Sequence, residues 1–186
     1  MSVSIIPFDP KIKKLIVEVM LNARTQQYTP ERLCELQKVV EAQYYYWWCM
    51  DMKKEEFCTE LFADDFTYYC FGPQTITGDG QALRSKFVNE NLATSHMGHQ
   101  PLVWFRSDTE ARAIFEYEDF HVYTDDMTPV SSNVVYVDDF RKESDGAWRI
   151  TAMRLAFKKI NGVYRSTDIP QGWEPKSWKP VLKKGE

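Results

Sequence analysis

The stretch ARAIFEYEDFHVYT, residues 111–124, decides the fold class. Side chains alternate between two faces along it, with the period of two that defines a β-strand. The odd-numbered face combines aromatic side chains with an acid and a histidine, whereas a solvent face is mostly charged and a core face mostly aliphatic. We expect this face to line a cavity, and a surface strand with aromatic cross-strand pairs is the alternative. The face comprises Ala111, Ala113, Phe115, Tyr117, Asp119, His121 and Tyr123.

Helices are predicted before this strand, and further strands on both sides of it. Asp9-Pro10 and Thr29-Pro30 are helix-start signals, and apolar residues at helical spacing follow each of them. Shorter helices are predicted over 53–62 and 81–92. Helices first and long antiparallel strands afterwards predict an α+β fold, in which a curved sheet wraps around helices and leaves a concave face. Strands are predicted at 66–71, 101–105, 131–142 and 147–160.

A chain of 186 residues is expected to form a single domain with extended ends. We divide it into an N-terminal helical extension (1–31), the α+β domain with its curved sheet (32–164) and an extended C-terminal tail containing proline and tryptophan (165–186).

Composition excludes several classes of protein. A net charge of −4 and a pI near 5.5 argue against nucleic acid as a partner. The absence of a signal-peptide pattern and of an apolar run of eighteen residues predicts a cytoplasmic protein that does not span a membrane. Four cysteines without a C-x-x-C pair predict buried thiols. Aromatic residues make up 15% of the chain, which suits either a core or a pocket for a bulky apolar ligand.

Asp51 is a candidate functional residue because of where it lies. It follows the aromatic run 44–48 near the predicted end of the second helix, where the negative end of the helix dipole disfavours a carboxylate. Such a buried acid requires a hydrogen-bond partner. Histidine is the natural one, because the carboxylate fixes the imidazole tautomer and raises the basicity of the other ring nitrogen.

The segment SHMGH, residues 95–99, offers two histidines and three interpretations: a metal site, a catalytic base with a neighbour, or packing. Gly98 and Pro101 argue against a helix, so His96 and His99 are not a helical pair of metal ligands. On a strand, residues three apart point to opposite faces. We therefore expect only one of the two histidines to reach the pocket that Asp119 faces, and we expect no metal and no cofactor.

Four stretches together resemble a known family: YWWCMDMKKEEFCTELFADDF (46–66), SHMGH, EYEDF (116–120) and DGAWRI (145–150). They are similar to the SnoaL-like proteins, the superfamily of scytalone dehydratase and nuclear transport factor 2, and within it to the bacterial bile-acid 7-dehydratases. The resemblance covers roughly residues 36 to 163. It implies a cone-shaped α+β barrel with a mixed or antiparallel sheet curved around helices, and it implies catalytic roles for His96, Asp51, Tyr46 and Asp119.

By the same resemblance, we expect a hydro-lyase that removes water from a 3-oxo-Δ4 steroid or bile-acid derivative hydroxylated at the 7α or 7β position. His96 would be the general base, oriented by Asp51. Tyr46 would donate a hydrogen bond to developing oxyanion charge or to the leaving oxygen, and Asp119 would protonate the departing hydroxyl or hold the imidazole. The substrate-binding residues expected are His121, Tyr117, Phe115, Tyr69 and Trp48.

The expected partner is an apolar polycyclic substrate, either as a free acid or as a coenzyme A thioester, and the resemblance implies a homo-oligomer, a trimer or a dimer. Two other functions fit the same fold. One is a polyketide cyclase or ketosteroid isomerase, and the other is a non-catalytic small-molecule binding protein.

Overall fold

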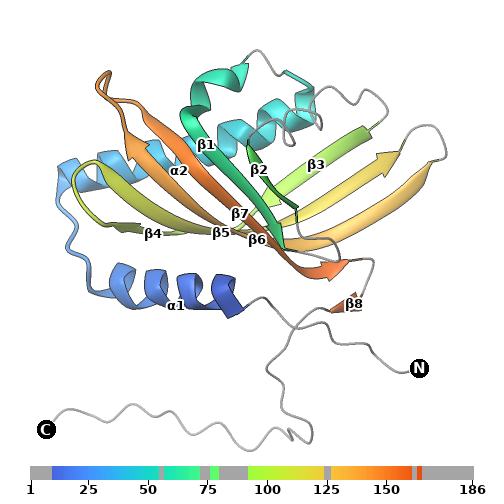
Figure 1. Cartoon of the computed structure of the whole chain (residues 1–186), viewed down its shortest axis with the longest axis horizontal. Coiled ribbons are helices and arrows are strands. Elements are labelled where there is room, and N and C mark those ends of the chain that lie inside the picture. The colour runs from blue at the N-terminus through green and yellow to red at the C-terminus, as the bar shows by residue number, and fades with distance from the viewer. Residues whose placement is uncertain are drawn as a thin grey trace, which may run out of the picture.

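The computed structural model describes residues 10–54, 57–71, 76–79, 92–123, 127–160 and 163–164. The chain runs from two helices into a curved sheet (Figure 1). The helices are α1 (Pro10–Thr25), α2 (Pro30–Met52) and the 3-10 turn η2 (Thr59–Leu61). The strands are β1 (Phe62–Phe71), β2 (Ile76–Asp79), β3 (Leu92–Gly98), β4 (Leu102–Phe105), β5 (Glu110–Tyr123), β6 (Thr128–Lys142), β7 (Trp148–Ile160) and β8 (Val163–Tyr164).

The strands form one mixed sheet in the order β2-β1-β7-β6-β5-β3, with β4 also paired to β5 and β8 to β7. The pair β1 and β7 is parallel, and the other pairs are antiparallel. The long strands β5, β6 and β7 make the centre of the sheet, which curves along their length (Figure 1). The predicted α+β class with a curved mixed sheet is confirmed.

The second helix lies on one face of the sheet and forms the main core with it. α2 begins at Pro30 after Thr29, whose side chain accepts a hydrogen bond from the Arg32 backbone N–H. It ends at Met52 and is capped by Lys53, where φ is 53°. Its apolar face packs on the inward side chains of the sheet, which include the buried Phe115 and Tyr117 from the odd-numbered face of β5. Phe115 and Tyr117 therefore point inward and not to solvent, and the expectation that this face lines a cavity stays a prediction.

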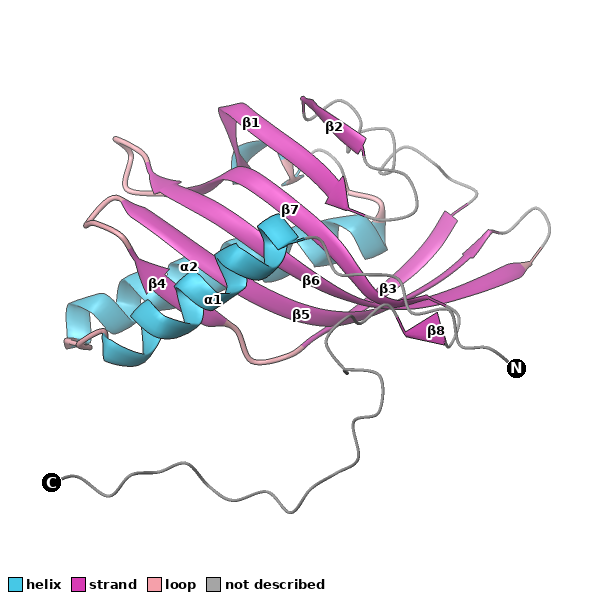
Figure 2. Cartoon of the chain, turned by 60° about the horizontal axis from the view of Figure 1, so that its bottom comes forward, coloured by secondary structure: helices cyan, strands magenta, loops and turns pink. Residues whose placement is uncertain are grey.

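The first helix covers the opposite face of the sheet (Figure 2). Ile12 of α1 is buried together with Val135 and Val137, whose side chains alternate in β6 with those that face α2. Arg112 ties the helix to the sheet, because its guanidinium lies 2.6 Å from Glu18 of α1 and 2.6 Å from Asp139 of β6. The predicted N-terminal extension therefore contains a helix that shields the outer face of the sheet.

Several local predictions are wrong. The segment 53–62 is not an α-helix, because Lys53 adopts a left-handed conformation and a 3-10 turn follows before β1 begins at Phe62. Residues 92–98, for which no strand was predicted, form β3. Cys34 is exposed rather than buried. The predicted helix over 81–92, apart from Leu92, and the tail 165–186 lie outside the described residues. No helix in the described ranges is long and apolar enough to span a membrane.

Candidate active site

His96 and Asp51 form a hydrogen-bonded dyad between β3 and the last turn of α2. The His96 Nδ1 atom lies 2.6 Å from Asp51 Oδ1, and the His96 backbone N–H donates to Asp51 Oδ2 at 2.9 Å. Thr94, two residues earlier on β3, donates its hydroxyl to Asp51 Oδ1 at 2.8 Å. The His96 side chain is 5% exposed and that of Asp51 is 19% exposed. The proximity expected of these two residues is therefore found.

Asp51 is held as a carboxylate by this arrangement. Burial alone would raise its pKa, but the hydrogen bonds and the charge of His96, together with the hydrogen bond from Thr94, hold the pKa below its usual range. An ionised Asp51 accepts a hydrogen bond from the Nδ1–H group, so the neutral imidazole keeps its proton on Nδ1 and carries its lone pair on Nε2. Nε2 is then the nitrogen able to act as a base.

A second imidazole and carboxylate lie directly across the β3–β5 ladder from the dyad. Asp119 pairs in register with His96, and His121 pairs with Thr94. The Asp119 Oδ2 atom lies 3.0 Å from His121 Nδ1 and accepts a hydrogen bond from the Ser132 hydroxyl at 3.0 Å. The Asp119 Oδ1 atom is buried without a hydrogen-bond partner. Two pairs capable of proton transfer thus share one face of the sheet.

Aromatic rings pack around the His96 imidazole. The ring of Trp47 lies 6.3 Å from it at an interplanar angle of 8°, and the ring of Tyr117 lies 5.3 Å from it at 29°. Phe115 contacts Trp47 edge-on at 6.0 Å. These apolar neighbours exclude water from the imidazole and hold its plane fixed.

Buried tyrosine hydroxyls lie beside these rings. The Tyr117 hydroxyl donates to that of Tyr136 at 3.3 Å, and the Tyr46 ring packs edge-on against Tyr136 at 6.3 Å. Burial raises the pKa of the Tyr46, Tyr117 and Tyr136 phenols. The nearby Tyr136 raises the pKa of Tyr46 further, and the Asp119 carboxylate raises that of Tyr117 further. Each phenol therefore keeps its proton and is able to donate a hydrogen bond.

Three residues singled out from the sequence are not brought into this cluster. His99 is exposed just after the end of β3, and its backbone N–H donates to Glu116 at 2.8 Å. Trp48 is 65% exposed on α2, so its predicted place in the pocket is corrected in favour of Trp47. Tyr69 packs against the Arg154 guanidinium at 5.7 Å, and its neighbour Tyr68 is the one that joins the buried core.

Sequence reasoning missed Thr94, Ser132 and Tyr136. Their side chains acquire their roles only through the register of β3, β5 and β6, which no local pattern in the sequence reveals. Helical spacing was a usable signal for Trp47, since it lies four residues from Gln43 and three from Met50, both of which are buried.

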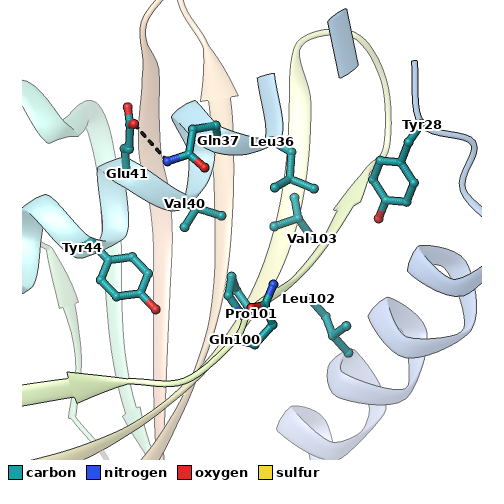
Figure 3. Close-up of a pocket in the computed structure, with 10 residues that line it drawn as sticks. All are labelled: Tyr28, Leu36, Gln37, Val40, Glu41, Tyr44, Gln100, Pro101, Leu102 and Val103. Atoms are coloured by element: carbon teal, nitrogen blue, oxygen red, sulfur yellow. Dashed lines mark hydrogen bonds between the residues drawn. The ribbon is translucent and has the colours of Figure 1, made fainter. Parts of the chain in front are cut away.

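A separate groove of about 620 Å³ lies between α2 and the segment that leads into β4 (Figure 3). Leu36, Val40 and Tyr44 form its wall on α2, and Gln37 donates to Glu41 at 3.0 Å beside them (Figure 3). None of the dyad residues lines this groove. Nowhere in the described ranges do three histidine, cysteine, aspartate or glutamate side chains gather as metal ligands would.

Comparison with known families identifies the chain. The model of the SnoaL-like domain matches residues 31–154, so the protein belongs to the SnoaL-like family. The match begins at residue 31, after the end of α1 at Thr25. A search of curated proteins finds no match.

Solved structures with the same fold share little sequence with this chain. A Novosphingobium aromaticivorans protein that carries the provisional name scytalone dehydratase is 21% identical, with a TM-score of 0.62 over 70% of this chain and 88% of its own. The hexachlorocyclohexane dehydrochlorinase LinA-type3 of Novosphingobium barchaimii is 16% identical, with a TM-score of 0.60 over 70% and 90%. Such likeness establishes the fold that the two proteins share with this one.

Proposed function

We propose that the protein is a cofactor-independent lyase that eliminates water from a hydroxylated, carbonyl-activated small molecule. The observation that carries this proposal is the 2.6 Å contact between His96 Nδ1 and Asp51 Oδ1 in a nearly water-free setting. A base oriented by a carboxylate is what removal of a proton next to a carbonyl requires. The names of two structural relatives, a dehydratase and a dehydrochlorinase, both denote eliminations and support the same reaction class.

The substrate that we propose is a 3-oxo-Δ4 steroid or bile-acid derivative with a 7α or 7β hydroxyl. The conjugated ketone makes the carbon-bound proton next to the leaving hydroxyl acidic. The His96 Nε2 atom takes that proton. The electron pair of the broken carbon–hydrogen bond forms the new carbon–carbon double bond, and the carbon–oxygen bond breaks. The apolar rings of Phe115, Trp47 and Tyr117 suit a flat polycyclic substrate.

The leaving hydroxyl needs a proton from an acidic group in order to depart as water. We assign this role to the Asp119 and His121 pair, which lies opposite the dyad on the same face of the sheet. The hydroxyl then departs as water. His96 releases the proton that it took to solvent, and solvent returns a proton to the Asp119 and His121 pair. Tyr46 and its neighbour Tyr136, which stay protonated, donate hydrogen bonds to the developing negative charge on the substrate oxygen.

The test is incubation with 7α- and 7β-hydroxy-3-oxo-Δ4 substrates, each as free acid and as thioester, followed by mass spectrometry. We expect loss of one water from one of these substrates. His96→Ala should lower the rate roughly 10²- to 10⁴-fold, the usual contribution of a general base. His99→Ala is the matched control, because His99 is exposed beyond β3, and it should leave turnover unchanged.

Other outcomes would redirect the assignment. A product of unchanged mass would indicate an isomerase, and tight binding without turnover, indifferent to His96→Ala, would indicate a binding protein. Unchanged turnover in His96→Ala would remove the mechanism. Elemental analysis of the purified, active protein tests the expectation that no metal takes part.

A further inference from the structure

The side chain of Gln43 is buried in the core, and its amide makes no hydrogen bond. Its side chain is 0% exposed, and both its Nε2 and its Oε1 atoms lack a partner. The Trp47 Nε1 atom, one helical turn further along the same face of α2, is also buried without a partner. Three unpaired polar atoms therefore lie within one turn of the helix.

Such a group is costly unless something binds to it. A buried donor or acceptor left without a partner loses its hydrogen bonds to water and gains none in return, and nearly all buried polar atoms in native proteins are paired. A leucine or methionine at position 43 would fill the same space without that cost. The three atoms thus indicate a missing polar partner in the functional state.

The position of the group points to the substrate as that partner. The Trp47 ring lies parallel to the His96 imidazole at 6.3 Å and contacts Tyr117 at 5.3 Å. The Trp47 indole accordingly packs beside the dyad, and Gln43 lies one helical turn before it on α2. Neither side chain is a member of the dyad or of the Asp119 and His121 pair, so we infer that their partner is a part of the substrate that does not react.

The chemistry of the atoms specifies the partner. A glutamine amide offers one acceptor and two donor hydrogens, and an indole N–H offers one donor. Both side chains are neutral, so neither would compensate a buried charge on the ligand. A hydroxyl group is the smallest group that both accepts from Nε2 or Nε1 and donates to Oε1.

We propose that Gln43 and Trp47 form a subsite for a neutral hydroxyl group of the substrate, distinct from the hydroxyl that is eliminated. This subsite makes the protein selective for ligands that carry such a second hydroxyl. The inference depends on the proposed function for the identity of the substrate, but ligand binding at the subsite does not depend on turnover. A trapped water molecule on the same atoms is the competing explanation.

Calorimetric titration with 2-naphthol and with 2-methylnaphthalene tests the subsite, because the two probes differ only by a hydroxyl in place of a methyl group. We expect the wild-type protein to bind 2-naphthol about tenfold more tightly or better, the ratio that corresponds to one hydrogen bond of about 1.4 kcal/mol. Gln43→Met should abolish this preference. Gln37→Met, which removes an exposed amide from the same helix, should retain it.

A second measurement identifies the indole. The Trp47 Nε1–H signal in a nitrogen-15 NMR spectrum, assigned by its loss in Trp47→Phe, should move on addition of 2-naphthol and not with the methyl analogue. Thermal unfolding shows whether each variant folds, and Gln43→Leu replaces Gln43→Met if the latter does not.

Equal affinity for the two probes in the wild-type protein would overturn the inference, and so would failure of both to bind. The inference would also be overturned if a folded Gln43 variant still bound 2-naphthol more tightly than 2-methylnaphthalene. A trapped water molecule would then explain the unpaired atoms. Because 2-naphthol carries no group to eliminate, this result is independent of the steroid assay. A failed dehydration with a positive naphthol result would refute only the proposed reaction.

Discussion

The indole of Trp47 and the imidazole of His96 lie with their planes 8° apart, one from α2 and the other from β3. The Gly98 backbone allows this approach, because a Cβ atom at that position would overlap the Trp47 ring and lie 3.0 Å from that of Tyr44. The orientation of the proposed base therefore depends on a glycine two residues away.

Gly98→Ala should displace Trp47 and disturb the imidazole plane. We expect a loss of roughly 1–3 kcal/mol in the free energy of unfolding, typical of overpacking, and a lower catalytic rate for the fraction that remains folded. Urea unfolding and turnover measured on the same preparation check both effects.

Gly146→Ala is the matched control for that variant. Gly146 has a φ of 83° and no heavy atom within 4 Å of an added Cβ, so the substitution introduces backbone strain without a steric clash. It should cost about 1 kcal/mol of stability and leave turnover intact. Unaltered stability and turnover in Gly98→Ala would contradict the role given to the Trp47 contact.

Titration to alkaline pH should distinguish the buried tyrosines from the exposed ones by the pH at which they ionise. Burial raises the pKa of Tyr46, Tyr117 and Tyr136 in the folded protein, whereas in the unfolded chain these phenols ionise near the ordinary value of about 10. Their contribution to stability is complete below about pH 10 and is lost as the pH rises above it, because only the unfolded chain releases the protons.

Ultraviolet absorbance of tyrosinate, followed against pH together with circular dichroism, measures this difference. We expect Tyr46, Tyr117 and Tyr136 to be among the tyrosines that ionise only as the protein unfolds, and Tyr136→Phe to lower the number of such tyrosines by one. Ionisation of all ten tyrosines near pH 10 in the folded state would be inconsistent with the buried cluster.

Arg112→Met should weaken the attachment of α1 to the sheet. The substitution leaves Glu18 without its partner and leaves Asp139 with Arg154 alone, at 2.9 Å. We expect a loss of about 1–3 kcal/mol in unfolding free energy with turnover per folded molecule unchanged, since these residues lie on the outer face. Denaturant titration provides the measurement.

Arg106→Met serves as the control, because Arg106 and Glu110 form a solvent-exposed pair at 3.7 Å. Removing it should change stability by less than about 1 kcal/mol. Equal effects of the two substitutions would indicate that the Arg112 network contributes no more than a surface ion pair.

The sequence predicted those features that follow from local periodicity. Alternation along β5 correctly placed Phe115 and Tyr117 inside, and the helix-start signals correctly placed Pro10 and Pro30. The need of a buried acid for a partner indicated that Asp51 would meet a histidine, and the resemblance to the SnoaL-like proteins indicated His96 as that histidine. The catalytic roles of these residues stay predictions until the variants are measured.

Other features depended on tertiary contacts and could not be read locally. The β3 sequence LATSHMG has little strand character, and its pairing with β5 and the bond from Asp51 to the His96 backbone fix it as a strand. Composition does not specify which of two neighbouring aromatic residues points inward, and in the structure Trp47 and Tyr68 are buried, whereas Trp48 is exposed and Tyr69 packs against Arg154.

The two halves of the dyad lie 45 residues apart, on a helix and on an edge strand that meet only when both are docked. An intermediate that has formed its strands but not yet seated α2 would therefore be chemically inert. Under the proposed function, turnover requires that α2 has docked, and recovery of turnover after dilution from denaturant would report this docking step.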